Sequence, residues 1–291
     1  MEFSMCSSCV ICMNIIGIKP YDRRFSCLMR RFLLLTLTDM WVLPVLILLL
    51  PWCIMGQQSA TDGKTEEQLL NSCLDGMHHK QVPGPEGSLY QQCSPWKDRA
   101  CCRGNVTEKM HQDQLFPYNF QWHHCGQLSP ACERHFMQDL CFYECSPNLG
   151  PWLVKIQMKI RNERFVNVPL CSSDCNQWWQ ACKDDLTCSG NWGKGWNWTS
   201  GVNQCPRGNQ CKTFKKYFGD ATNFCQKIWD GSFTVVPDTE PCMTQWFDGL
   251  NPNNAVARKR ATEIVQASAG ELSATVSYVL LGVGIFLVKL W

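Results

Sequence analysis

The stretch SPACERHFMQDLCFYECSP, residues 129–147, decides the fold class because it combines the start and stop signals of a helix with three cysteines. Ser129 is a typical N-cap residue, and Pro130 is favoured at the first helical position. Pro147 cannot continue a helix, so we predict that the helix ends near Cys145. A short helix with three cysteines is typical of a small domain held together by disulfides.

One face of this predicted helix carries an unexpected charge. The residues at helical spacing on that face are Cys132, Phe136, Asp139, Leu140 and Tyr143. A buried carboxylate is unfavourable unless it has a partner. Asp139 therefore has either a donor within the protein or a ligand, and the residues alone favour neither interpretation.

The chain has 21 cysteines among its 291 residues. This density, without a repeated zinc-binding spacing, indicates disulfides formed in an oxidising compartment. Five cysteines precede the predicted mature start, which leaves an even sixteen for eight bridges and no spare thiol. The sixteen are Cys73, Cys93, Cys101, Cys102, Cys125, Cys132, Cys141, Cys145, Cys171, Cys175, Cys182, Cys188, Cys205, Cys211, Cys225 and Cys242.

Residues 1–56 are predicted to be an N-terminal extension that ends in a signal peptide. Trp41–Met55 is an apolar run of signal-peptide length rather than membrane-spanning length, and the small residue Gly56 follows it. Met40 is an alternative initiator. The Cys6-x-x-Cys9-x-x-Cys12 spacing has no accompanying histidine or second cysteine pair, so we expect no zinc there.

Residues 269–291 are predicted to be a removed attachment signal for a glycosylphosphatidylinositol (GPI) anchor. The run Val276–Trp291 is apolar but short for a membrane span of about twenty residues. Small residues precede it, and we expect Ser268 to carry the lipid that ties the protein to the membrane. A marginal transmembrane helix is the alternative. In both cases the cysteine-rich part faces the outside of the cell.

Between these ends we predict one cysteine-rich domain, residues 57–250, and a stalk, residues 251–268. This part of the chain contains no repeat, low-complexity tract or long linker. Two further helices are predicted at Ser173–Asp185 and Ala221–Trp229, where cysteines and tryptophans recur at helical spacing.

The charge and the sequons describe the outer surface. A formal net charge of +2 is too small for a nucleic-acid-binding protein, so we expect no nucleic-acid partner. Sequons at Asn105 and Asn197 permit N-glycosylation if these side chains are exposed.

The segment Lys155–Arg164 is rich in basic residues. One interpretation is a solvated basic face. The other is that Arg161 and Arg164, three residues apart and so neighbours on a turn, act together as forked donors to the polar edges of a ligand.

The stretch NWGKGWNWTSG, residues 191–201, holds three tryptophans and a lysine at alternate positions. In an extended conformation Trp192, Lys194, Trp196 and Trp198 would project from one face. Such a face is either ordinary core or the wall of a site for a flat, anionic ligand. Taken alone, the stretch favours core.

The sequence contains no pattern typical of a catalyst. The Gly-x-Ser-x-Gly elbow, the phosphate loop and the His-Glu-x-x-His helix are all missing from the sequence. His78-His79 and His123-His124 are adjacent pairs, and adjacent residues do not share a helix face. We therefore expect binding rather than turnover, with no metal and no cofactor.

Three runs give the chain a specific resemblance. Cys141–Trp152 (CFYECSPNLGPW), Asn167–Cys171 (NVPLC) and Lys194–Gly201 (KGWNWTSG) resemble the folate receptor family, which also includes riboflavin carriers and an egg-surface adhesion receptor. The similarity extends from about Cys73 to Ala257 and covers the sixteen cysteines. The resemblance implies a small, disulfide-rich α+β fold, a compact globular ectodomain of short helices and strands held by eight disulfides.

The resemblance also implies a ligand site that takes folate with its pterin ring first. Asp139 would accept hydrogen bonds from the N–H groups of the pterin. Tyr143 and Trp229 would sandwich the ring, and Arg161 and Arg164 would donate to its polar edge. Ser232 would be a further polar contact. The pocket wall would be formed by Tyr118, Phe120 and Trp122. The pocket mouth would be formed by Trp192, Lys194, Gly195, Trp196 and Trp198. At the mouth, Lys194 would offset the negative charge of the glutamate tail.

Three positions depart from the folate-binding pattern. Ile160 stands where the family has a tryptophan, Gly193 where it has a histidine, and Phe233 where it has a tyrosine. These changes remove stacking area and donors near the middle and mouth of the pocket, so affinity should weaken. The pterin end is intact.

The sequence thus leads to a functional hypothesis, a GPI-anchored cell-surface receptor that binds folates as ligands and mediates their uptake by endocytosis. The alternatives are an egg-surface adhesion receptor for a sperm protein and a riboflavin carrier. Asp139 favours the first hypothesis, because the adhesion relative lacks this aspartate.

Overall fold

Helix α6 (Pro130–Cys145) forms where the sequence predicts it. The computed structural model describes residues 61–288, and the predicted extension and signal peptide, 1–56, lie outside the described residues. The Ser129 hydroxyl caps α6 by accepting a hydrogen bond from the backbone N–H of Cys132 at 3.3 Å. The chain leaves the helix at Ser146, whose extended backbone is the conformation that a following proline favours.

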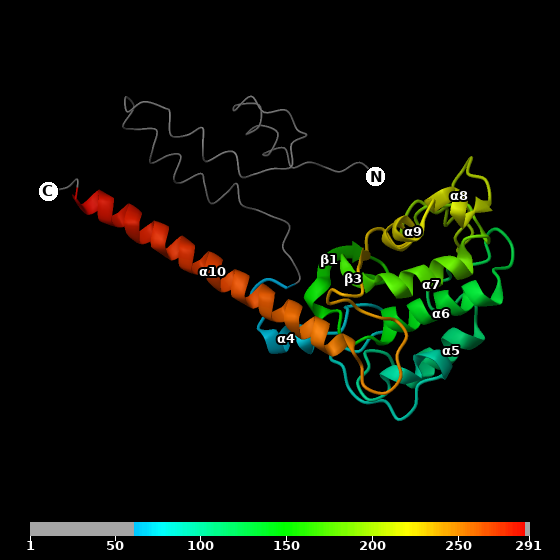
Figure 1. Ribbon diagram of the computed structural model, residues 1–291, viewed down its shortest axis with the longest axis horizontal. Coiled ribbons are helices and arrows are strands. Elements are labelled where there is room, and N and C mark those ends of the chain that lie inside the picture. Colours follow the sequence, from blue (N-terminus) through cyan, green and yellow to red (C-terminus); the bar gives the residue numbers. More distant parts are fainter. Residues whose placement is uncertain (1–60, 289–291) are drawn as a thin grey trace. The chain divides into compact units, whose positions relative to one another are not determined.

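Helix α7 (Ser172–Cys182) lies beside α6, as Figure 1 shows. It ends three residues before the predicted end, because the N–H of Asp185 bonds to the carbonyl of Cys182 and turns the chain back. The Asp185 carboxylate then accepts hydrogen bonds from the backbone N–H and the hydroxyl of Ser129, both at 2.8 Å. The end of α7 is thus tied to the start of α6.

Helix α9 (Ala221–Lys227) is also shorter than predicted. Beyond it the chain enters a turn in which Asp230 and Gly231 have φ angles of 55° and 77°. A right-handed helix cannot contain these left-handed residues. The turn places Trp229 and Asp230 at the end of the helix, where both side chains are available to the candidate site.

Eight disulfides hold the described part of the chain together, as predicted. Three of them involve α6, and Cys132–Cys182 links this helix directly to α7. The eight pairs are Cys73–Cys101, Cys93–Cys141, Cys102–Cys145, Cys125–Cys211, Cys132–Cys182, Cys171–Cys242, Cys175–Cys225 and Cys188–Cys205.

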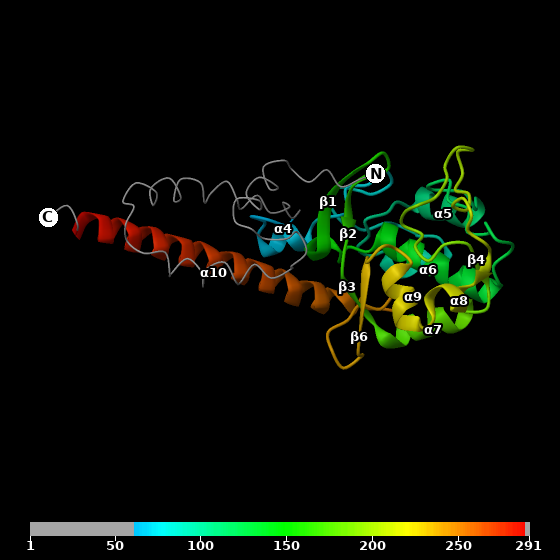
Figure 2. The same ribbon diagram turned by 90° about the horizontal axis from the view of Figure 1, so that it is seen from above.

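The strands in residues 61–288 form three two-stranded sheets. β1 (Leu153–Met158) and β2 (Arg161–Phe165) form an antiparallel hairpin. β3 (Val168–Cys171) and β6 (Phe233–Val236) pair in parallel, side by side in Figure 2. The remaining sheet is small and antiparallel, formed by β4 (Leu186–Thr187) and β5 (Lys212–Thr213). Together with the short helices, these sheets confirm the predicted α+β, disulfide-rich class.

The hairpin corrects one prediction about the basic segment. Arg161 and Arg164 lie on strand β2, where residues three apart point to opposite faces. The prediction that they are neighbours on a turn is therefore wrong. The chain turns instead at Lys159 and Ile160, and the two guanidinium groups reach different partners.

The remaining short helices complete the domain. Thr65 and Gln68 form a reciprocal capping box at the first of them, and the Thr213 hydroxyl caps another. These elements are α4 (Glu66–Leu70), η4 (Gln91–Trp96), α5 (Gly104–Gln112), η5 (Gly150–Trp152) and α8 (Phe214–Phe218).

The segment predicted as a stalk, residues 251–268, forms the first turns of α10 (Asn253–Val288). Ala257 and Ala261 are fully buried, and the Thr262 hydroxyl donates to Glu66 of α4 at 3.1 Å. The first turns of this segment therefore belong to the folded domain. Within the residues that the structure describes, no helix is both long and apolar enough to cross a membrane.

Candidate functional site

Asp139 is the buried carboxylate at the centre of the site. Its side chain projects from α6 and is only 5% exposed. Oδ2 accepts a hydrogen bond from the indole N–H of Trp229, and Oδ1 accepts one from the amide of Gln245, both at 2.7 Å. Burial raises the pKa of Asp139 to about 7, although the two hydrogen bonds act in the opposite direction. The carboxylate therefore has donors within the protein.

Gln245 is a residue of the site that the sequence did not reveal. Its backbone N–H donates to the buried carboxylate of Asp174, and its carbonyl accepts from the Gln138 amide at 2.5 Å. Burial raises the pKa of Asp174, against the opposing effect of its hydrogen bonds. The charge at Asp139 signalled the need for a donor, but nothing in the sequence placed a residue so distant in the chain beside it.

Aromatic rings enclose the Asp139–Trp229 pair. The Trp229 ring lies edge-on to Phe136 and Trp192, with ring centroids 6.4 Å and 5.8 Å apart. Phe136 and Trp192 stack in parallel at 4.6 Å. Phe120 contacts both Trp229 and Trp192, with ring centroids 6.0 Å and 5.5 Å apart. Asp139 and Trp229 therefore lie beside a group of packed aromatic rings.

Tyr143 lies one turn beyond Asp139 on α6 and packs in a different group. Its ring lies edge-on to Tyr118, with centroids 6.1 Å apart, and its hydroxyl accepts a hydrogen bond from Arg161 at 3.2 Å. The Tyr118 hydroxyl donates to Glu144 at 2.5 Å. The structure thus places Tyr143, Tyr118 and Arg161 together, and Trp229 with other rings.

Arg164 and Lys194 converge on the turn that follows α9. The Arg164 guanidinium donates to the carbonyls of Trp229 and Asp230 at 3.0 Å and 2.5 Å, and its Nη2 lies 3.4 Å from the Ser232 hydroxyl. Arg164 and Lys194 also form ion pairs with the Asp230 carboxylate at 3.1 Å and 2.6 Å. Two positive residues predicted for opposite ends of the ligand therefore share one carboxylate, which the sequence analysis missed.

The tryptophan-rich stretch does not present one face. Gly195 has a φ of 84° and turns the chain, so the Trp196 indole N–H donates to the carbonyl of Trp192 at 3.0 Å. Trp192 and Trp196 are 2% and 9% exposed, whereas Trp198 is 46% exposed. The stretch is therefore not extended, and the single face that an extended conformation would give does not form. The first two indoles belong to the core, and the third lies at the surface with Lys194.

The other predicted wall residue lies near this centre, and two of the divergent positions lie elsewhere in the domain. Trp122 lies 5.9 Å from Phe136 between ring centroids. Phe233 is buried against Phe142 and Phe165, and Ile160 accepts a backbone hydrogen bond at the tip of the β1–β2 hairpin. Phe233 has therefore become part of the core.

Asn105 and Asn197, the two sequon asparagines, are both exposed. The Thr107 hydroxyl of the first sequon is buried and donates to the carbonyl of Gly104 at 2.7 Å. Ser268 is exposed on α10, and its hydroxyl bonds to the carbonyl of Ile264 at 3.0 Å.

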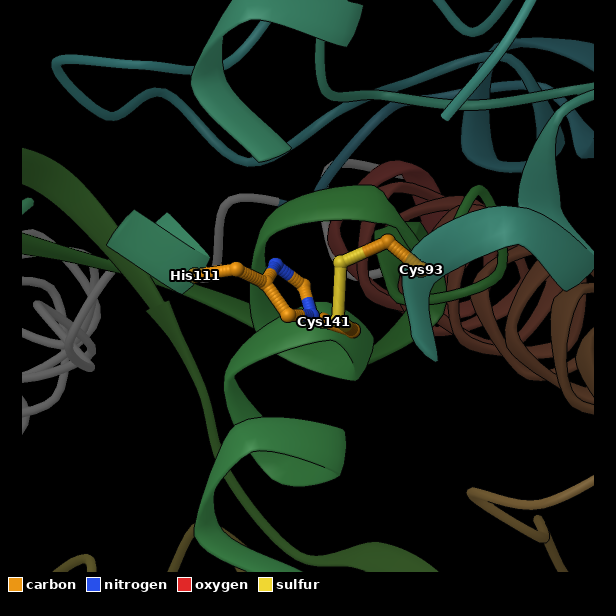
Figure 3. Close-up of side chains that lie close together, drawn as sticks. All are labelled: Cys93, His111 and Cys141. Carbon is orange, nitrogen blue, oxygen red and sulfur yellow. A yellow bond between two sulfur atoms is a disulfide. The ribbon is translucent and has the colours of Figure 1, made fainter. Parts of the chain in front are cut away.

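Clusters of cysteine and histidine in the described residues do not offer a metal site. Figure 3 shows His111 beside Cys93 and Cys141, whose sulfurs are bonded to each other. The other such groups are also built on disulfide cysteines. A cystine sulfur has no thiolate to offer a metal ion.

Two open hollows lie away from Asp139. One, of about 570 Å³, is bordered by β1, β3, β6 and α10, and the other, of about 630 Å³, by α4 and α10. None of the predicted site residues lines either hollow.

Comparison with known proteins matches residues 72–244 to the Folate receptor family. The chain is 45% identical to folate receptor gamma of Homo sapiens over 223 residues, which cover 75% of this chain and 91% of the relative. It is 47% identical to folate receptor alpha of Homo sapiens over 219 residues, covering 73% of this chain and 85% of the relative. It is 34% identical to riboflavin-binding protein of Gallus gallus over 193 residues, covering 64% and 74%.

Proposed function

Since this chain belongs to the folate receptor family, we propose that it binds folates at Asp139 and acts as a receptor rather than as an enzyme. The observation that carries the proposal is the buried Asp139 carboxylate, which accepts two N–H donors between aromatic rings. A pterin offers the same combination, a flat ring with N–H donors at its edge.

Binding would exchange one set of donors for another. Each carboxylate oxygen has room for two hydrogen bonds, so Asp139 can accept from a pterin while it keeps a contact to Gln245 or Trp229. The Trp229 ring would move to lie over the pterin. Asp139 would then lose the hydrogen bond from the Trp229 indole and accept one from the ligand instead. Arg161 and Tyr143 would then face the ring from the other side.

The anchor and the uptake route belong to the same proposal. We propose that a GPI lipid at Ser268 holds the receptor at the outer cell surface and that endocytosis carries the ligand inward. The exposure of Ser268 supports the first step. Release of the protein from intact cells by a phosphatidylinositol-specific phospholipase would test the anchor, and retention after that treatment would argue for a membrane span.

The binding proposal is tested by titrating the purified, disulfide-intact ectodomain with folic acid, reduced folate and riboflavin. We expect folic acid to bind and Asp139→Ala to weaken it by about tenfold or more, which is about 1.4 kcal/mol. Equal affinities for the two proteins would refute the role of Asp139. Tighter binding of riboflavin than of both folates would assign the site to the other vitamin.

A further inference from the structure

Asp230 is an anionic group at the place where the site residues Arg164 and Lys194 meet. Oδ1 lies 2.6 Å from Lys194 Nζ and accepts from the Asn191 amide at 2.7 Å, while Oδ2 lies 3.1 Å from Arg164 Nη1. Three donors from two separate parts of the chain therefore converge on one carboxylate. It directly follows Trp229, the residue whose indole N–H donates to Asp139.

The backbone around Asp230 is built for this arrangement. Its φ of 55° is left-handed, a conformation that Asp and Asn tolerate better than most residues. A Cβ added at Gly193 would lie 3.0 Å from the Asp230 Cβ and 3.2 Å from the Asn191 Oδ1. The glycine at position 193 thus leaves the space in which Asp230 and Asn191 meet. The missing side chain at position 193 and the Asp230 side chain therefore depend on each other at the pocket mouth.

Asp230 offsets one of the two positive charges at this mouth before any ligand arrives. Burial acts to raise the pKa of Asp230, but hydrogen bonds from Lys194, Asn191 and Arg164 and the charge of Lys194 outweigh it, so the pKa is lowered. Asp230 therefore stays ionised at neutral and mildly acidic pH. Lys194 is 67% exposed at the side chain and is the more accessible partner. A ligand carboxylate that approaches Lys194 from solvent must therefore compete with Asp230 for the same ammonium group.

We propose that Asp230 sets the charge specificity of the mouth. It already pairs with Lys194 and Arg164, and so makes the site discriminate against pterin ligands with anionic tails. This inference rests on the proposed folate-binding function. The pterin head would be held at Asp139 in every case, and the tail charge would decide between ligands. A neutral tail loses nothing at this mouth, whereas a tail carboxylate competes with Asp230 for the exposed Lys194.

A purely structural role for Asp230 makes a different prediction. If its contacts only held the turn after α9 in place, removing its charge would change the affinity for charged and neutral ligands by the same factor. A role in charge specificity changes the ratio of the two affinities and makes the change dependent on salt. The ratio is therefore the quantity to measure.

The test uses folic acid and its neutral bis-amide, which share the pterin, the linker and nearly the same shape. Both are titrated by calorimetry into the secreted ectodomain of the wild type, of Asp230→Asn and of Glu240→Gln. Asn keeps the size of the side chain and tolerates the left-handed backbone. Glu240 is exposed in the turn after β6, so its substitution removes the same charge at another place. Asp230→Ser serves as a second neutral variant if Asp230→Asn is not secreted.

We expect the wild type to bind the bis-amide at least as tightly as folic acid. Asp230→Asn should shift the affinity ratio towards folic acid by about threefold or more, a size typical of partly exposed charge pairs. The shift should shrink at about 0.5 M salt, because screening shortens the reach of exposed charges. Glu240→Gln should keep the wild-type ratio.

Two failures are distinguishable. If both ligands bind and the ratio is the same in wild type and Asp230→Asn, the inference about Asp230 is overturned and the proposed function stands. If neither ligand binds to any of the correctly folded proteins, both are overturned. An equal shift of the ratio in Glu240→Gln would also overturn the inference, because the effect would then belong to net charge.

Discussion

The amide of Gln245 donates to Oδ1 of Asp139 at 2.7 Å, across a separation of 106 residues in the sequence. This contact joins the loop after the last disulfide cysteine to the middle of α6. It also completes the pair of donors on a carboxylate that the core would otherwise leave with Trp229 alone. The Gln245–Asp139 hydrogen bond therefore affects both the free energy of unfolding and the pKa of Asp139.

Gln245→Met should therefore destabilise the domain. The substitution keeps the length of the side chain but removes the donor, and a buried acceptor that loses a bond costs about 1–3 kcal/mol in the free energy of unfolding. Chemical denaturation near neutral pH measures this loss. It should be smaller at about pH 5, where Asp139 is protonated and needs the donor less.

The exposed Gln210 provides a matched control for this experiment. Gln210→Met makes the same chemical change at the surface and should alter the free energy of unfolding by less than about 0.5 kcal/mol. Equal losses in the two variants would mean that the Asp139 contact contributes nothing measurable.

Asp139→Asn should change how stability depends on pH. The pKa of Asp139 is raised from 3.8 to about 7 in the folded protein, so the folded state holds the proton more tightly than the unfolded chain. The free energy of unfolding of the wild type therefore falls as pH rises through this window, by at most about 1.4 kcal/mol per pH unit for one proton. The asparagine has no proton to lose.

The stability of Asp139→Asn relative to wild type should accordingly increase from acidic to neutral pH. The Gln245 amide can rotate so that its oxygen accepts from the amide introduced in place of the carboxylate. Denaturation curves at several pH values check the slope, with the exposed Asp98→Asn as the comparison. A difference between Asp139→Asn and wild type that stays constant with pH would contradict the raised pKa.

Folate affinity should fall on acidification through the same group. Protonation of Asp139 replaces an acceptor by a donor, which disfavours the N–H edge of a pterin. With the pKa raised to about 7 by burial, the change should occur between neutral pH and about pH 5. Dissociation rates measured over this range should rise in the wild type. They should change much less in Asp139→Asn, and a parallel rise in both proteins would place the sensitivity elsewhere.

Removing Cys132–Cys182 should destabilise the fold more than removing Cys188–Cys205. The first bridge closes 50 residues and the second 17, and a longer loop gains more chain entropy when it is opened. The loop-length model gives a difference of about 1 kcal/mol between the two losses. Paired Cys→Ser variants compared by denaturation test the order, and a reversed order would show that local packing outweighs the loop.

The sequence predicted the elements that depend on local chemistry. Ser129, Pro130 and Pro147 define α6 because caps and prolines act on neighbouring residues, and the count of sixteen cysteines correctly predicted eight bridges. The predicted turn for Arg161 and Arg164 failed, because the strand pairing of β2 is decided by its partner strand.

The contacts of the site were less predictable than the elements. A single Gly195 with a left-handed φ sends Trp192 and Trp198 to different environments, and an alternating pattern of letters does not reveal this turn. Gln245 and Asp230 reach the site through long-range contacts with Asp139 and Lys194, which no spacing along the chain encodes. The sequence therefore indicated that Asp139 needed a partner, but it identified neither Gln245 nor Asp230 as a residue of the site.

Gly193 and Asp230 should be energetically coupled. A Cβ at position 193 would lie 3.0 Å from the Asp230 Cβ, closer than ordinary contact, and 3.4 Å from the Trp229 carbonyl carbon, at the near limit of ordinary contact. Gly193→Ala should thus lower the free energy of unfolding by about 1 kcal/mol or more, because the crowded atoms have to move. Asp230→Gly removes the nearer atom and suits the left-handed backbone. The double variant should therefore be more stable than the sum of the two single losses predicts, and a thermodynamic cycle of the four proteins measures this coupling. Additive losses would mean that the backbone of Trp229, rather than Asp230, sets the limit at Gly193.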